Sequence, residues 1–345
     1  MEKELWQYLK TVQKPIVLYG MGNGADKIIN VLENYGISFD GVFASDGFVR
    51  NKTFHGFKIS SYSELKEKFG DMVVLLCFGS DRLEVLENIK RISKDCELFA
   101  PDVPVIDGEL FTEKYVGENK NDLEWVYERL ADDLSRKTFE NTVKYKLSGK
   151  IDYLLECETD FDEPYETFFK LGNEEKFLDL GAYNGDTVLD FINRVQFYDK
   201  IIAVEPDCKT FKKLLCNTEN IEKLECKNLC ISDFVGTAPF GMKHGRNSKA
   251  FTGEILAEFA TIDSVVADTG VTYIKMDIEG QELNAIKGAV RTISEFAPKM
   301  LISCYHRTED LITIPKAVLE IKNDYKIYMR HFHSLPAWDT NYYFV

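Results

Sequence analysis

The sequence has 345 residues, of which 45% are hydrophobic and 29% charged, and its formal net charge is −15. The length favours two domains, and the composition excludes a disordered chain, a collagen-like fibre and a coiled-coil rod. The acidic balance argues against nucleic acid as the main partner and against general binding to anionic lipid.

The chain lacks the sequence pattern of a membrane or exported protein. Its longest apolar run, residues 72–78, is far shorter than the roughly 20 residues that span a bilayer. Acidic residues follow Met1, where a signal peptide requires a basic stretch. We therefore expect a cytoplasmic protein with no membrane span. Its eight cysteines contain no Cys-x-x-Cys pair and are expected to be reduced thiols.

The first predicted unit, residues 1–104, opens with a buried strand at 16–19 and a glycine-rich turn at 20–25. A helix over 26–34 and a second strand over 41–44 are expected to follow. This pattern is typical of a dinucleotide-binding turn, with an acid placed to reach a ribose hydroxyl. The alternative is a Rossmann-like unit that keeps the turn only for folding or docking. The residues of this second nucleotide or nucleotide-sugar site would be Gly20, Gly22, Gly24 and Asp46.

The middle segment, residues 105–172, holds −8 of the net charge. Apolar residues repeat every three or four positions over 121–134, which predicts a helix with one apolar stripe. We interpret the segment as an acidic helical connector, with the acids on its solvated face.

The third unit, residues 173–345, begins with a strand at 177–180 and a second glycine turn that leads into a helix. Tyr183 occupies the middle glycine position, and its side chain would obstruct a pyrophosphate. Asp186 lies at the start of the helix, where its charge would repel phosphate. This turn therefore predicts a nucleoside ligand without phosphates.

Acidic residues follow the next strands of this unit. Glu205 ends a strand over 200–204, where a carboxylate can accept hydrogen bonds from a ribose diol. Asp233 ends a strand expected over 224–231, where it meets an adenine amino group or is simply a turn residue. Asp277 ends a fourth strand. A nucleoside bearing a cationic sulfonium suits the carboxylates of Asp179, Glu205 and Asp277, and S-adenosyl-L-methionine is such a molecule.

Five motifs from about residue 160 to the end resemble those of FkbM-type methyltransferases: Leu178-Asp-Leu-Gly-Ala-Tyr-Asn-Gly-Asp-Thr, Val204-Glu-Pro-Asp, Ile231-Ser-Asp, Lys275-Met-Asp-Ile-Glu-Gly-Gln-Glu and Ser303-Cys-Tyr-His. The resemblance implies S-adenosyl-L-methionine-dependent methylation, mostly of hydroxyls on sugars or complex natural products. The N-terminal unit is similar, more weakly, to the small Rossmann-like domain of some such proteins. The expected cofactor-binding residues are Asp179, Gly181, Tyr183, Asn184, Gly185, Asp186, Thr187, Glu205, Pro206, Ser232, Asp233 and Asp277.

The expected fold class is α/β, with two doubly wound Rossmann-like domains joined by the helical connector. The C-terminal domain is expected to contain the seven-stranded sheet of a class I methyltransferase, ending in a hairpin.

An alcohol acceptor is a poor nucleophile, so a positioned base should assist methyl transfer. Asp277 and His306 follow neighbouring strands, and we expect both to be catalytic. We interpret His306 as the base and Asp277 as the residue that holds cofactor or acceptor, and the reverse assignment is also open. No metal site is assigned, although His331 and His333 could join His306 and Glu279 around an ion.

The expected partner is a small-molecule or glycan acceptor, and the assembly of copies into a homo-oligomer is left open. Two other functions compete with the methyltransferase. One is an NAD-dependent oxidoreductase that uses the first glycine turn, and the other is a non-catalytic nucleotide-sugar-binding protein. The complete second turn, with Glu205 and Asp277 in order, favours the methyltransferase.

Overall fold

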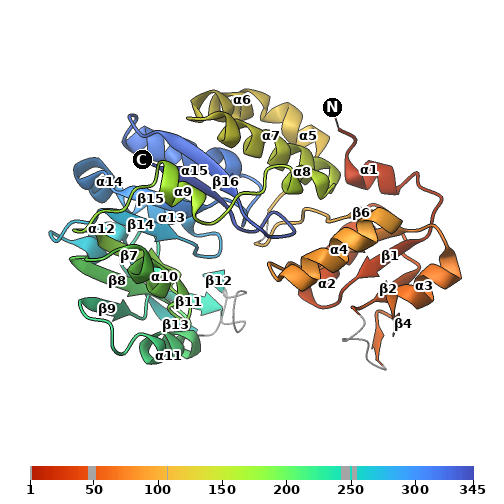
Figure 1. Ribbon diagram of the computed structural model, residues 1–345, viewed down its shortest axis with the longest axis horizontal. Helices are drawn as coiled ribbons and strands as arrows, with labels where there is room; N and C mark the ends of the chain where they lie inside the picture. Colours follow the sequence, from red (N-terminus) through yellow and green to blue (C-terminus); the bar gives the residue numbers. More distant parts are fainter. Residues whose placement is uncertain (1, 46–51, 107, 242–248, 251–254) are drawn as a thin grey trace.

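The computed structural model describes residues 2–45, 52–106, 108–241, 249–250 and 255–345. Figure 1 shows two α/β units, with helices of the connector lying above and between them. The expected α/β class with two doubly wound sheets is confirmed. None of the described helices is long and apolar enough to cross a membrane.

The N-terminal unit contains a six-stranded sheet in the order β3-β4-β2-β1-β5-β6. The fully buried strand β1 lies in its middle and pairs in parallel with β2 on one side and β5 on the other. The expected first strand, turn and helix are confirmed, whereas the β3–β4 hairpin and β6 were not predicted. The elements are α1 (Leu5–Leu9), β1 (Ile16–Tyr19), α2 (Asn23–Asn34), β2 (Gly41–Phe43), β3 (Thr53–Phe54), β4 (Phe57–Ser60), α3 (Tyr62–Phe69), β5 (Val73–Leu76), α4 (Leu83–Asp95) and β6 (Glu97–Phe99).

The connector is helical, but the prediction of a single helix over 121–134 is wrong. The chain leaves the helical conformation at Leu130, and the Asp132 side chain then accepts a hydrogen bond from Ser135 N (2.7 Å) to cap a new helix. The connector packs on both units: Phe139 joins the core of the C-terminal unit and Tyr145 that of the N-terminal unit. Its helices are α5 (Glu113–Glu118), α6 (Lys120–Arg129), α7 (Asp133–Ser148), α8 (Asp152–Leu155) and α9 (Glu163–Thr167).

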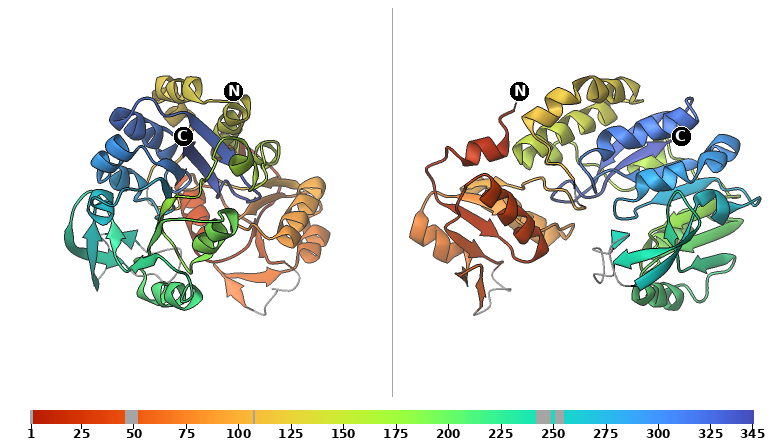
Figure 2. Two further views of the ribbon diagram at one scale, coloured as in Figure 1. Left: turned by 60° about the vertical axis from the view of Figure 1, so that its left-hand side comes forward. Right: turned by 180° about the vertical axis from the view of Figure 1, so that it is seen from behind.

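The C-terminal unit contains the expected seven-stranded sheet, in the order β16-β17-β15-β14-β7-β8-β9. Strand β7 pairs in parallel with β8 and β14, and the terminal strands β16 and β17 form an antiparallel pair. Figure 2 shows this sheet from two further sides. The strands of the sheet are β7 (Lys176–Leu180), β8 (Lys200–Val204), β9 (Leu224–Lys227), β14 (Tyr273–Met276), β15 (Lys299–Ser303), β16 (Ile327–His331) and β17 (Thr340–Phe344).

The prediction of one continuous strand over 224–231 is wrong, because the chain leaves the main sheet after β9. The next residues form β10, which pairs with β13 in a separate four-stranded sheet in the order β10-β13-β11-β12. The strands of this sheet are β10 (Cys230–Ile231), β11 (Gly236–Gly241), β12 (Lys249–Ala250) and β13 (Ile255–Ala260).

The helix expected after Asp277 is interrupted at Gly288. A Cβ there would lie 2.4 Å from the Ser232 carbonyl oxygen, so the close approach of these two segments requires glycine. The helices of this unit are α10 (Asp186–Arg194), α11 (Cys208–Asn217), α12 (Ile262–Val266), α13 (Glu282–Lys287), α14 (Val290–Phe296) and α15 (Asp310–Ile321).

Candidate functional site

A cavity of about 600 Å³ opens at the carboxyl ends of β7, β8 and β14. Its floor includes the turn after β7, where Gly181 has a φ of +79°. A Cβ on Gly181 would lie 1.9 Å from the carbonyl oxygen of Asp277, so only glycine lets β7 and β14 end side by side. Because β8 and β14 lie on opposite sides of β7, this is the position at which open α/β sheets bind ligands.

Glu205 extends into this cavity from the end of β8. One carboxylate oxygen accepts a hydrogen bond from Tyr183 N (3.1 Å) and the other from Asp207 N (2.8 Å). These contacts fix the carboxylate beside the glycine turn. Burial raises the pKa of Glu205 to about 7, so its charge changes near neutral pH.

Only part of the expected cofactor-binding set lines the cavity. The residues that do are Gly181, Tyr183, Asp186, Thr187, Glu205, Pro206 and Asp277. Asp179 instead lies fully buried beneath the turn, where it accepts a hydrogen bond from the Thr187 hydroxyl (2.5 Å). It therefore supports the cavity wall from behind.

The remaining expected residues have other positions. Asn184 accepts a hydrogen bond from the Asn217 side chain through its carbonyl (2.8 Å), and Gly185 is the N-cap of α10. After β10, Ser232 is fully buried and Asp233 is exposed. None of these four residues is among the described residues that line the cavity.

Lys275 was missed by the sequence reasoning, although it lines the cavity. Its ammonium donates to the carbonyl of Gly181 (3.0 Å) and pairs with Asp179 (3.5 Å). Burial disfavours its charge, but the neighbouring carboxylates, Asp179 first, outweigh that effect and raise the pKa of Lys275. A lysine within the apolar strand β14 is the signal that could have identified this buried support of the turn.

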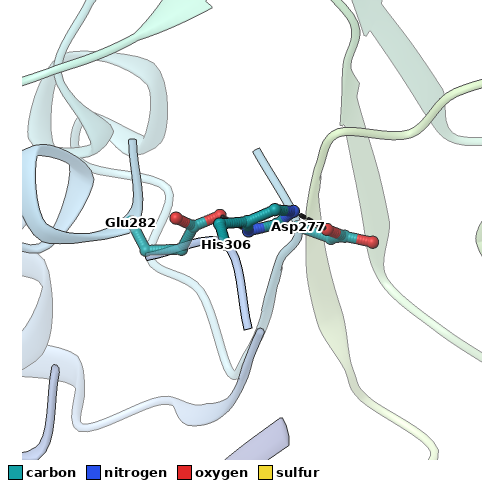
Figure 3. Close-up of side chains that lie close together, drawn as sticks. All are labelled: Asp277, Glu282 and His306. Atoms are coloured by element: carbon teal, nitrogen blue, oxygen red, sulfur yellow. Dashed lines mark ion pairs between the residues drawn. The ribbon is translucent and has the colours of Figure 1, made fainter. Parts of the chain in front are cut away.

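Asp277 and His306 lie together, and Glu282 joins them (Figure 3). The imidazole of His306 lies between the two carboxylates. Its Nδ1 is 3.1 Å from Glu282 Oε1, and its Nε2 is 3.4 Å from Asp277 Oδ1. His306 and Glu282 are buried, whereas the Asp277 side chain is 33% exposed and faces the cavity. Asp277 is therefore the member of the cluster that a ligand can reach.

The charge state of His306 follows from its neighbours. Burial alone disfavours the imidazolium, but Glu282, Asp277 and Glu279 outweigh that effect and raise the pKa of His306 to about 10. His306 is thus protonated at neutral pH and cannot accept a further proton. Asp277 remains able to accept one, and its carboxylate also accepts a hydrogen bond from the Tyr305 hydroxyl (3.1 Å).

Glu282 is the second residue that the sequence reasoning missed. It begins α13, and its Oε1 accepts a hydrogen bond from Ile278 N (2.9 Å), which fixes the carboxylate beside His306. The signal was present in the Asp-Ile-Glu-Gly-Gln-Glu sequence that starts at Asp277, since its last acid is the first residue of the helix.

One oxygen or nitrogen atom from each of Asp277, Glu282 and His306 lies within 4.8 Å of the others, a spacing that a metal ion can use. The two carboxylates face opposite ring nitrogens, however, so the arrangement better suits an imidazolium held between two carboxylates. The other two histidines considered for a metal are engaged elsewhere. His331 is buried beside the Thr340 hydroxyl (2.9 Å), and His333 pairs with Glu158.

The first glycine turn borders a second cavity, of about 480 Å³, through Asn23 and Gly24. A Cβ on Gly24 would lie 2.3 Å from the carbonyl oxygen of Cys77, so this glycine allows α2 to pack against the end of β5. Gly20 is equally close to the ring of Phe78. Asp46, the fourth expected residue of this site, lies outside the described residues.

Part of the C-terminal unit matches a protein-family model. Residues 179–328 match the model of the methyltransferase FkbM domain. A search of curated proteins found no match.

Among solved structures, the chain is similar to a methyltransferase FkbM from Methylobacillus flagellatus. The TM-score is 0.73 and the identity 24%, over 96% of this chain and 90% of that one. A fibrillarin from Aeropyrum pernix with bound S-adenosyl-L-methionine has a TM-score of 0.33 and 16% identity, over 52% of this chain and 70% of that one. A precorrin-6y C5,15-methyltransferase from Geobacter metallireducens has a TM-score of 0.33 and 12% identity, over 51% and 80%. The first likeness shows that the fold extends over both units.

Proposed function

We propose that this chain, which carries an FkbM methyltransferase domain over residues 179–328, transfers a methyl group from S-adenosyl-L-methionine to a hydroxyl of a sugar or complex natural product. The observation that carries the proposal is the position of Glu205. Its carboxylate lies in the larger cavity, held by backbone N–H groups beside the glycine turn.

The residues around the larger cavity fit this cofactor. Glu205 would accept hydrogen bonds from the ribose hydroxyls, and Leu229 and Ile231 offer apolar surface to the adenine. Tyr183 and Asp186 lie where a dinucleotide would place its phosphates, and they favour a nucleoside without them. The polar and apolar groups of the cavity therefore match an adenosine that carries a positive charge.

When bound, S-adenosyl-L-methionine supplies a methyl group on a sulfonium, which the acceptor oxygen takes as the carbon–sulfur bond breaks. Asp277 receives the proton of the acceptor hydroxyl, because its carboxylate faces the cavity and is not enclosed by the protein. His306 and the Tyr305 hydroxyl hold that carboxylate in place. The walls of the cavity would align the reacting groups.

This assignment takes up the alternative that the sequence left open, in which Asp277 and not His306 is the base. His306 is buried between carboxylates as an imidazolium, so it positions Asp277 and stabilises its negative charge. Glu282 keeps His306 protonated from the opposite side of the ring. Asp277 is the proposed catalytic residue, and His306 and Glu282 are the proposed positioning residues.

Isothermal titration with S-adenosylhomocysteine tests the cofactor half of the proposal. The wild type should bind, and Glu205→Ala should bind at least tenfold more weakly because charged hydrogen bonds contribute about 1.5–3 kcal/mol. Glu225→Ala is the matched control, since Glu225 pairs with Lys200 on the surface of β9. Absence of binding to the wild type, or equal binding by Glu205→Ala, would contradict the proposal.

A further inference from the structure

The two cavities adjoin each other at the proposed site of methyl transfer. Both are lined by Asp81, Asp277, Glu279, Tyr305 and Asp339. The larger cavity lies on the side of Glu205, and the second cavity lies on the side of the N-terminal unit. A molecule in the second cavity would therefore have direct access to Asp277.

The second cavity occupies the ligand-binding position of the N-terminal sheet. Strands β2 and β5 lie on opposite sides of β1, so the order in which successive strands are added to the sheet reverses between β1 and β5. Open α/β sheets bind ligands outside the carboxyl ends of the strands at this point. Gly24 and the residues that follow β5, Cys77 and Phe78, line the cavity there. The binding crevices of the two sheets thus face one shared space.

The N-terminal unit is fixed in this position by direct contacts with the C-terminal unit. The backbones of Ser80 and Leu335 exchange two hydrogen bonds (2.8 and 3.1 Å). A Cβ on Gly79 would lie 2.2 Å from the ring of Trp338, so Gly79 allows this ring to pack on the loop after β5. The walls of the second cavity are therefore held together by contacts between the two units.

Acidic side chains dominate the junction of the two cavities. Asp277, Glu279 and Asp339 line it, and a negatively charged ligand would be repelled there. The cations of the second cavity are engaged within the protein. Lys146 pairs with Asp102 at 3.0 Å, and Lys27 donates to two backbone carbonyls. Arg82 pairs with Glu84, and His306 lies between Asp277 and Glu282.

The same side chains favour an uncharged ligand that bears hydroxyl groups. Carboxylates accept hydrogen bonds from hydroxyls, and these charge-assisted bonds are stronger than neutral ones. The half-buried Trp338 adds an apolar surface to the wall, against which the carbon face of a ring can pack. The volume of about 480 Å³ lies within the usual range for small-molecule sites.

We propose that the second cavity is the acceptor site, and that it holds an uncharged, hydroxyl-rich ring compound between the two units. The N-terminal unit is then a specificity domain that contacts the acceptor, and its glycine turn serves the packing of α2 rather than a nucleotide. This inference rests on the proposed methyltransferase function and adds to it the location and chemical class of the acceptor.

Binding measurements with defined probes test the inference without turnover. A panel of uncharged methyl glycosides of hexoses and deoxyhexoses is titrated by ligand-detected NMR into the full chain in the presence of S-adenosylhomocysteine. Glucose 6-phosphate and UDP-glucose are the charged probes. We expect several methyl glycosides to bind, and both charged probes to bind at least tenfold more weakly than the best of them.

A matched pair of variants locates the site. Asn23→Trp places a large ring into the second cavity from the exposed start of α2 and should weaken glycoside binding at least tenfold. Glu67→Trp, on the exposed face of α3, should bind like the wild type. Both variants should keep wild-type affinity for S-adenosylhomocysteine and the wild-type melting temperature.

The outcomes separate the two proposals. Failure of the wild type to bind S-adenosylhomocysteine would refute the methyltransferase proposal itself. Normal binding of S-adenosylhomocysteine would leave that proposal standing, but three results would then overturn the acceptor site: no glycoside binding, tighter binding of UDP-glucose or glucose 6-phosphate, or unchanged glycoside binding by Asn23→Trp.

Discussion

In the proposed function, Glu205 binds the ribose of the cofactor, and its environment should make that affinity depend on pH. Burial raises the pKa of Glu205 to about 7, so the carboxylate is mostly protonated at pH 6 and mostly ionised at pH 8. Only the ionised form accepts two strong hydrogen bonds from a ribose diol. Affinity for S-adenosylhomocysteine should therefore rise about tenfold from pH 6 to pH 8, as measured by isothermal titration.

The control for this pH dependence is Glu205→Gln, which cannot ionise. Its affinity should be weaker than that of the wild type at pH 8 and nearly constant across the range. A wild-type affinity that does not change between pH 6 and pH 8 would show that the charge of Glu205 does not govern binding.

His306 is the second residue whose charge decides its role. In the wild type its pKa lies near 10 because Glu282, Asp277 and Glu279 surround the buried ring. Glu282→Gln removes the closest carboxylate charge, so the imidazolium should lose its proton at lower pH, between about pH 6 and 9. The chemical shifts of the imidazole, followed by NMR across this range, measure the change.

The exposed pair of His55 and Asp26 provides the control, since their side chains lie 2.9 Å apart on the surface of the N-terminal unit. Asp26→Asn should leave the titration of His306 unchanged. A His306 that titrates near pH 6.5 in the wild type would return the role of base to this histidine.

At this scale, the sequence was sufficient to identify acids that end strands. Glu205 and Asp277 were predicted because the carboxyl ends of parallel strands meet at one edge of a sheet. Glu282 and Lys275 were not predicted, because their roles depend on contacts across the fold: one with a histidine from the next strand, the other with the turn after β7. Spacing along the chain does not encode those distances.

Among the structural elements, the turn after β7 depends on one glycine. Gly181→Ala would place a Cβ 1.9 Å from the backbone of Asp277 at a φ of +79°, so we expect a loss of about 2–5 kcal/mol in the free energy of unfolding. Gly36→Ala is the control. Gly36 also has a positive φ, but its Cβ would meet nothing within 4 Å, so the loss should be only about 1–2 kcal/mol. Urea denaturation measures both, and equal losses would contradict the steric explanation.

Arg330 connects β16 to the helices of the connector. It is 1% exposed and forms ion pairs with Asp132, at the start of α7, and with Glu163, in α9. Arg330→Met removes both pairs and leaves two carboxylates beside an apolar side chain, so the free energy of unfolding should fall by about 3 kcal/mol. Lys120→Met removes an exposed pair with Glu124 and should cost less than about 0.5 kcal/mol. Similar urea midpoints for the two variants would argue against a stabilising role of Arg330.

Element boundaries show why part of the fold could not be predicted. The buried strand β1 follows directly from an uninterrupted apolar run, and β7 and β14 follow from short apolar runs that contain Asp179 and Lys275. The helix break near Leu130 depends on a cap whose side chain also pairs with Arg330, about 200 residues later in the chain. The departure of β10 from the main sheet likewise depends on its pairing with β13, which the local sequence does not specify.

For the whole molecule, the number and type of units were predictable, but their relation was not. Two glycine turns, each after a buried strand, predicted two doubly wound sheets, and both are present. The crevices of these sheets meet at Asp277 because the loop after β5 contacts residues near Trp338. These contacts are not apparent from the sequence. Under the proposal above, the first glycine turn forms part of the wall of an acceptor site instead of a nucleotide site.

The central claim is that the larger cavity binds S-adenosyl-L-methionine with its reactive end toward Asp277. A crystal structure of the full chain grown with S-adenosylhomocysteine tests it most directly. We expect electron density for the ligand in the larger cavity, with the ribose hydroxyls on Glu205 and the sulfur beside Asp277. Ligand density in the second cavity against Asn23 and Gly24, or no ligand in either cavity, would contradict it.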